Sequence, residues 1–161
     1  MPAKQGDVSL LNDPLAQELL QSAIYARLAY NWRDGTPRVI PLAFHWDGKE
    51  IVMGTPPDAP KMKAINKQKV AVTTDSEGFP TKVLYIRGTA NVSMMDGVVP
   101  EYALAVKRYT GEEGAEAWLK QVSQMFSQMA RIAITPEWVG LLDFQQRFPS
   151  AIEKAMAGAG D

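Results

Sequence analysis

The stretch DGTPRVIPLAFHWDG, residues 34–48, has a turn signal at each end and a proline inside an apolar run. The two Asp-Gly dipeptides, at 34–35 and 47–48, accept the positive φ angles of tight hairpin turns, which predicts a strand over 38–46. Pro41 cannot donate to a β-ladder, so within sheets this residue type is confined to edges and bulges. The segment is therefore expected to form a strand that has something other than a second strand along one side.

Alternation and turn signals predict further strands around this segment. The full set of expected strands is 25–32, 38–46, 49–55, 70–75, 82–92, 131–135 and 138–144. Capping residues and helical spacing predict helices at 14–23 and 59–68, and two more within 97–130 that are separated at Gly111 and Gly114. The first three strands are expected to form a hairpin-joined meander. Together these elements favour a mainly β fold, a small antiparallel barrel with flanking helices.

Size and composition restrict the classes of function. At 161 residues the chain is expected to be a single domain over 1–161, with a flexible leader at 1–11 and a flexible tail at 149–161. The net charge of −1 argues against a nucleic-acid or membrane-surface partner. The chain has no cysteine and one histidine, so no metal site is expected. With neither a signal peptide nor an apolar run of spanning length, we expect a cytoplasmic protein.

The segment TPPDAPKMKAINK, residues 55–67, is a candidate anion site. Asp58 can cap a helix whose first amides point outward, and lysines at 61, 63 and 67 add positive charge. Residues two apart on a helix diverge by about 200°. Lys61 and Lys63 can therefore meet one phosphate only if Lys61 lies in the first turn of the helix. The alternative is a solvated, lysine-rich helix face.

Other polar and aromatic residues give weaker indications. For His45 a structural role at a strand end is favoured over catalysis, because no spacing suggests a triad. Arg38 and Arg87 lie in half-buried strands, where a charge needs a carboxylate, a cofactor phosphate or a second subunit, unless the strand face is exposed. The stripe at 118–129 is interpreted as core or dimer packing. No pair of carboxylates suits acid–base chemistry, so the catalytic residues stay unassigned.

Three segments in a fixed order resemble a known family. ARLAYNWRDGTPRVIPLAFHWDGKEIVMGT, PKMKAINKQKVAVTTD and VLYIRGTANV, within residues 20–93, resemble the pyridoxamine 5′-phosphate oxidase-like, FMN-binding split-barrel superfamily. RIAITPEWVGLLDF resembles the closing strands of that family. The resemblance implies an antiparallel split β-barrel that forms a homodimer and binds a flavin in a cleft at each dimer interface.

The same resemblance implies roles for particular residues. The strand at 38–42 would run past the flavin ring, which would account for Pro41, and the turn after the next strand would hold the phosphate. The candidate cofactor-binding residues are Arg38, Val39, Ile40, Pro41, Thr55, Lys61, Lys63 and Trp138. Arg147-Phe148-Pro149 lacks the spacing of the arginine-leucine-x-proline motif of true pyridoxamine phosphate oxidases, which argues against vitamin B6 oxidation.

The function that follows is an FMN-binding oxidoreductase carrying out hydride transfer on a small organic substrate. Such chemistry belongs to the cofactor ring and needs no acid–base pair on the protein. Three alternatives stay open. The first is a reductase dependent on the deazaflavin F420, for whose anionic tail Lys67 and Lys69 could extend a basic groove. The others are a non-catalytic flavin- or haem-binding protein and a cofactor-free interaction module.

Overall fold

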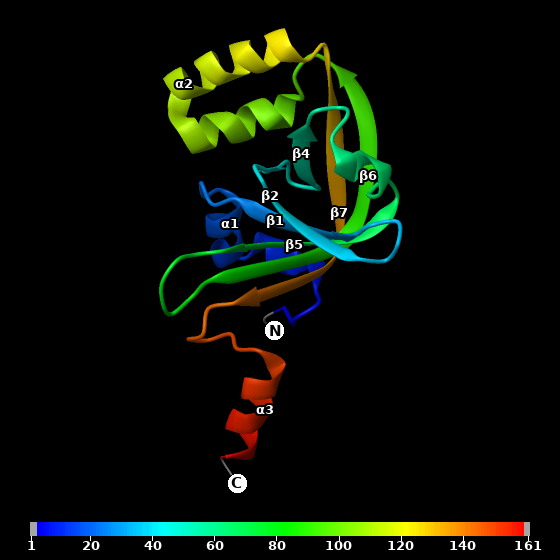
Figure 1. The fold of residues 1–161 in the computed structure, drawn as a ribbon. Coiled ribbons are helices and arrows are strands. Elements are labelled where there is room, and N and C mark those ends of the chain that lie inside the picture. The colour runs from blue at the N-terminus through cyan, green and yellow to red at the C-terminus, as the bar shows by residue number, and fades with distance from the viewer. Residues whose placement is uncertain (1–2, 160–161) are drawn as a thin grey trace.

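The computed structural model describes residues 3–159, which fold around one antiparallel sheet with helices outside it (Figure 1). The sheet has seven strands in the order β2-β1-β5-β6-β7-β4-β3 and is not closed. Its strands are β1 (Ala26–Asn31), β2 (Pro37–Leu42), β3 (His45–Trp46), β4 (Ile51–Thr55), β5 (Gln68–Asp75), β6 (Val83–Asp96) and β7 (Gln128–Leu142). The helical elements are η1 (Val8–Asn12), α1 (Pro14–Leu20), η2 (Pro60–Lys63), α2 (Pro100–Met125) and α3 (Ser150–Gly158). The expected mainly β split barrel with flanking helices is confirmed.

The segment 34–48 does not form one strand of a meander. β2 pairs with β1, where Pro41 lies opposite Arg27, and no strand in the described part of the chain pairs with its other side. After Leu42 the chain leaves this edge and forms β3, which pairs with β4 at the opposite end of the sheet. The predicted meander is therefore wrong. Pro41 is tolerated because β2 is an edge strand, where a missing N–H leaves no ladder bond unmade.

Two more of the predicted elements differ in the structure. The expected helix at 59–68 is only the short 3₁₀ turn η2. The two expected last strands form one continuous strand, β7, whose pairing with β6 shifts in register between Arg87 and Gly88. The predicted break at Gly111 is confirmed, because this residue has φ 77° and divides α2 into two arms that fold back on each other (Figure 1).

The two chain ends differ from each other. Residues 3–11 were expected to be a loose leader, but the Gln5 side chain exchanges two hydrogen bonds with the backbone of Leu141, and Leu10 and Leu11 are buried. At the other end α3 extends away from the barrel with every side chain exposed (Figure 1). Residues 1–2 and 160–161 of the expected leader and tail lie outside the described residues. No helix among residues 3–159 is long and apolar enough to cross a membrane.

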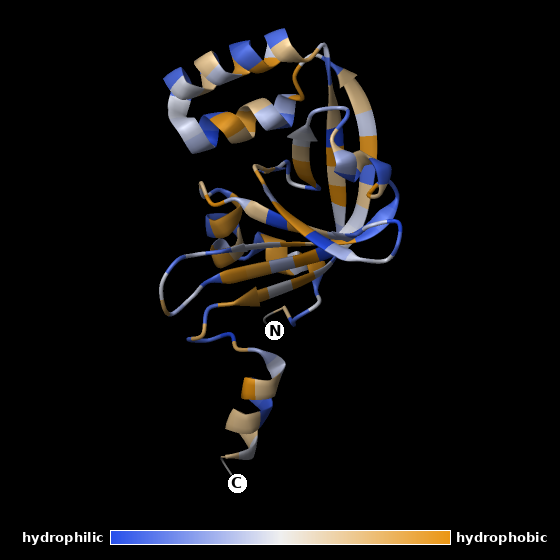
Figure 2. Ribbon diagram, viewed as in Figure 1, coloured by the Kyte–Doolittle hydropathy of each residue, from blue (hydrophilic) through white to orange (hydrophobic). Residues whose placement is uncertain are grey.

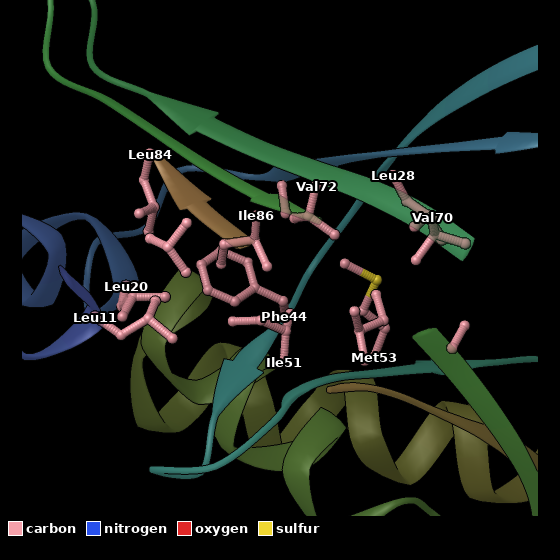
Figure 3. Packing of buried hydrophobic residues seen from close by; sticks show 14 of the residues in the cluster. Leu11, Leu20, Leu28, Phe44, Ile51, Met53, Val70, Val72, Leu84 and Ile86 are labelled. Carbon is pink, nitrogen blue, oxygen red and sulfur yellow. The ribbon is translucent and has the colours of Figure 1, made fainter. Parts of the chain in front are cut away.

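The core fills the inside of the barrel. Apolar positions recur along the strands (Figure 2), and their side chains meet those of α1 and η1. Figure 3 shows Phe44, Ile51 and Met53 facing Val72 and Ile86 across this space, and all five are buried. Burying one such side chain fully contributes about 1.5–3 kcal/mol. The barrel interior is therefore filled with side chains, and a ligand must bind on its outside.

Substitution of Gly88 tests the bulge between β6 and β7. A Cβ at this position would lie 2.1 Å from the backbone oxygen of Thr135, and backbone cannot move aside as a flexible side chain can. We expect Gly88→Ala to lower the free energy of unfolding by about 1–3 kcal/mol in a denaturant titration. Gly158→Ala is the control, because a Cβ there meets nothing within 4 Å. Equal stability of the two variants would contradict this account.

Candidate functional site

The outer face of β2 is the starting point of the site. Ile40 and Leu42 point inward and pack on the core, so the alternate residues Val39 and Pro41 point outward. Val39 is 64% exposed, which is high for a valine in a strand. Because no strand in the described part of the chain covers the free edge of β2, the backbone groups along this edge are also open to a ligand.

A first pocket, here the Val39 pocket, has a volume of about 420 Å³. It is lined by Arg27, Ala29, Val39, Ala71, Val72, Thr73, Tyr85, Ile86, Arg87 and Trp138. The guanidinium carbon of Arg87 lies 4.0 Å from the centre of a ring of Trp138, and Arg27 forms an ion pair with Asp75. Arg87 is exposed and stacks on this aromatic face, and no carboxylate pairs with it among residues 3–159. The pocket combines an apolar floor with two cationic groups.

A second pocket, here the Pro41 pocket, has a volume of about 380 Å³. Its lining is Tyr25, Pro41, Leu42, Ala43, Gly54, Thr55, Pro56, Tyr102, Val106, Tyr109, Thr110 and Trp118. Val39 and Pro41 are two residues apart on the same face of β2, about 6.6 Å along a strand. The two pockets are therefore neighbours along β2, and together we call them the β2 cleft.

The aromatic wall of the Pro41 pocket comes from α2. A Cβ at Gly54 would lie 2.6 Å from the Cβ of Tyr102, so only glycine lets α2 come this close to β4. The fold at Gly111 brings the second arm of α2 back, and Trp118 Nε1 donates a hydrogen bond to the Tyr102 hydroxyl at 2.8 Å. Trp118 is 42% exposed in the single chain, so it does not belong to the core, whereas Val122 of the same stripe is buried. Packing of this stripe in a dimer stays a prediction.

The lysines of the predicted anion site follow directly after this pocket. Thr55, at the end of β4, is only 3% exposed, and the chain then runs into η2. Lys61 is half-buried there, pairs with no carboxylate among residues 3–159, and burial lowers its pKa. Lys63 is exposed, and its backbone oxygen accepts a hydrogen bond from Arg33 Nε at 2.8 Å. A half-buried cation without a counter-ion carries a desolvation cost that a bound anion can offset.

Not all the predicted cofactor residues come together. Thr55 and Pro41 line one pocket, and Val39 and Trp138 line the other. Arg38 is exposed and stacks on Trp32 at 4.0 Å instead. Ile40 faces the barrel interior, and its backbone N–H and C=O point toward β1.

The single histidine lies outside the β2 cleft. His45 is in β3 and lines a separate pocket with Arg108. Its pKa is lowered, first by burial and then by the positive charge of Arg108, which keeps the imidazole neutral at pH 7. A structural role for His45 is consistent with this environment. Among residues 3–159, no group of three histidine or acidic side chains is placed to hold a metal ion.

The sequence matches no family model and no curated protein, but several solved structures share its fold. An F420 reductase is 23% identical, with a TM-score of 0.57 over 77% of this chain and 94% of that one. A FAD- and haem-binding protein of Mycobacterium smegmatis is 18% identical, with a TM-score of 0.55 over 91% of this chain and 78% of that one.

A candidate pyridoxamine 5′-phosphate oxidase of Listeria innocua is 20% identical, with a TM-score of 0.55 over 83% of this chain and 98% of that one. At these identities the likeness concerns the fold alone. The open seven-stranded antiparallel sheet with its outer helices agrees with that likeness. The chain therefore has the split-barrel fold of the pyridoxamine 5′-phosphate oxidase-like superfamily, as the sequence resemblance predicted.

Proposed function

We propose that the protein is an FMN-binding oxidoreductase that carries out hydride transfer on a small organic substrate in the β2 cleft. The observation that carries this proposal is Lys61, a half-buried cation without a carboxylate partner in the described chain, placed six residues after the buried Thr55. A phosphate would suit this position, because it accepts strong charge-assisted hydrogen bonds from an ammonium group.

The residues present fit a flavin mononucleotide. Lys61, Lys63 and Thr55 would hold its phosphate, and the free edge of β2 at Val39 and Pro41 would lie along its ring. When bound, a flavin supplies hydride transfer, while the protein orients the reactants and excludes water. The described residues that line the β2 cleft include no pair of carboxylates. Hydride transfer by a flavin does not require such a pair.

The proposal includes a homodimer. Val39 and Tyr85, which are 64% and 40% exposed, form an apolar patch with Trp138 on the outer face of the sheet. A patch of this kind at a candidate binding cleft is typical of a protein–protein interface, where aromatic residues and arginine are enriched. A second copy of the chain over this patch would close the β2 cleft from solvent, which hydride transfer favours.

An F420-dependent reductase is the second candidate. It is supported by the likeness to an F420 reductase and by the positive charge around η2, where Arg33 donates a hydrogen bond to the backbone oxygen of Lys63 and Lys67 follows. Lys69 does not extend this basic region, because its ammonium lies 2.6 Å from Glu137. A non-catalytic haem-binding role is less well supported, since the single histidine, a common ligand of haem iron, lies outside the cleft.

Cofactor binding tests the proposed function directly. Protein from a host that makes FMN but no deazaflavin is expected to show a two-banded flavin spectrum that survives gel filtration. Lys61→Ala is expected to weaken FMN binding about ten- to a hundredfold in a fluorescence titration, because a charged hydrogen bond contributes about 1.5–3 kcal/mol. Lys49→Ala, at an exposed turn, is the control and should leave the affinity unchanged.

Each other outcome has a distinct meaning. Unchanged affinity in the Lys61 variant would reject its phosphate role. A colourless protein that captures F420 but not FMN would support the deazaflavin reductase. A haem spectrum would support the haem-binding alternative, and a protein that binds none of these would leave only the fold.

The homodimer predicts a second result. Val39→Lys would bury a third cation beside Arg27 and Arg87 in the proposed interface, which is strongly unfavourable. Light scattering after gel filtration should give twice the 17.7 kDa chain mass for the native protein and a single chain mass for the variant. Met94→Lys makes the same change at an exposed apolar residue of β6, outside the Val39 pocket, and should stay dimeric. A monomeric native protein would refute this part of the proposal.

A further inference from the structure

The Pro41 pocket differs from its neighbour in charge. None of the described residues that line it carries an ionisable charge at neutral pH, whereas the Val39 pocket contains two arginines. Four of its lining residues are aromatic: Tyr25, Tyr102, Tyr109 and Trp118. Moving a charged group into such a pocket costs its hydration without an ion pair in return. The lining therefore favours an uncharged ligand with aromatic faces.

The hydroxyl of Tyr102 adds a directional requirement. Tryptophan Nε1 can only donate, so in the hydrogen bond from Trp118 the Tyr102 oxygen is the acceptor. The proton of Tyr102 is left to donate, and no acceptor receives it among residues 3–159. The hydroxyls of Tyr109 and Thr110 differ, because they donate to the backbone oxygens of Ile24 and Val106. Tyr102 thus offers the pocket a donor that is already oriented by Trp118.

Stacking geometry in the wall agrees with a planar ligand. The rings of Tyr25 and Tyr109 lie 4.7 Å apart between centres, in contact with each other, while Tyr25 remains 53% exposed. Exposed aromatic faces attract a further ring in offset or tilted arrangements, worth about 0.5–1.5 kcal/mol beyond the area buried. A pocket of about 380 Å³ accommodates a ligand of two fused rings.

We propose that the Pro41 pocket binds an uncharged, planar ring compound that carries a carbonyl oxygen, with this oxygen accepting the hydrogen bond of Tyr102. Pro41 and Thr55 line this pocket and are also candidate flavin contacts, so the compound would lie against the cofactor at these two residues. That this compound is the substrate of the enzyme rests on the proposed function, whereas its binding to the Pro41 pocket does not.

Three naphthalene probes of similar size test the proposal in the full-length protein without added cofactor. They are 2-acetylnaphthalene, which has a carbonyl acceptor, 2-ethylnaphthalene, which has none, and 2-naphthoate, which is an anion. By calorimetric titration the native protein is expected to bind the acetyl probe about three- to tenfold more tightly than the ethyl probe, and the anion at least about tenfold more weakly than the acetyl probe.

Variants of single tyrosines identify the donor. Tyr102→Phe should remove the preference for the acetyl probe over the ethyl probe and leave ethyl binding unchanged. Tyr85→Phe, the same change in the Val39 pocket, should retain the preference. Trp118→Phe is a second variant, and it should reduce the preference because the Tyr102 hydroxyl loses the bond that orients it.

The outcomes separate this inference from the proposed function. Equal binding of the acetyl and ethyl probes by native protein, or an unchanged preference in both the Tyr102 and Trp118 variants, would overturn it. Competition between saturating FMN and the acetyl probe would also overturn it, since the pocket would then belong to the cofactor ring. Retained, Tyr102-dependent probe binding in a protein that binds no flavin would support the pocket while refuting the oxidoreductase.

Discussion

The crossing of the chain from β2 to β3 is the constraint on which the rest of the structure depends. β2, at one edge of the sheet, ends at Leu42, and β3, at the other edge, begins at His45. Only two residues therefore connect strands at opposite ends of the strand order. Phe44 anchors this crossing at 1% exposure in the core. Arg108 of α2 donates hydrogen bonds to the backbone oxygens of Phe44 and Ser22, and thereby holds α2 against the crossing.

Two features of the β2 cleft follow from that crossing. Because the chain turns inward at Phe44 and the β3–β4 hairpin forms at the opposite end of the sheet, no strand among residues 3–159 pairs with the outer edge of β2, and Pro41 there disturbs no ladder. Because Arg108 fixes the first arm of α2, Tyr102 on the same arm is held over Gly54 of β4. The open edge and the aromatic wall beside it are therefore consequences of one packing arrangement.

The sequence predicted most of the strands but not how they are connected in space. Alternation and Asp-Gly turns are local signals, and they identified β1 and β4, but the single strand expected over 38–46 is divided between β2 and β3. The change of sheet edge at residues 43–44 is invisible to them, because Phe44 continues the inward face of Ile40 and Leu42 without a break in period. The division of this expected strand between the two ends of the sheet is a property of tertiary packing, which outweighs local pattern.

The candidate site, like the fold, was predictable from the sequence only where its residues are close together along the chain. Thr55 and Lys61 follow a strand end that the sequence could locate, whereas the Tyr102–Trp118 pair joins residues sixteen positions apart across a fold in α2. The one local sign of this wall was Gly54, a glycine inside an apolar strand, which often marks a close backbone approach.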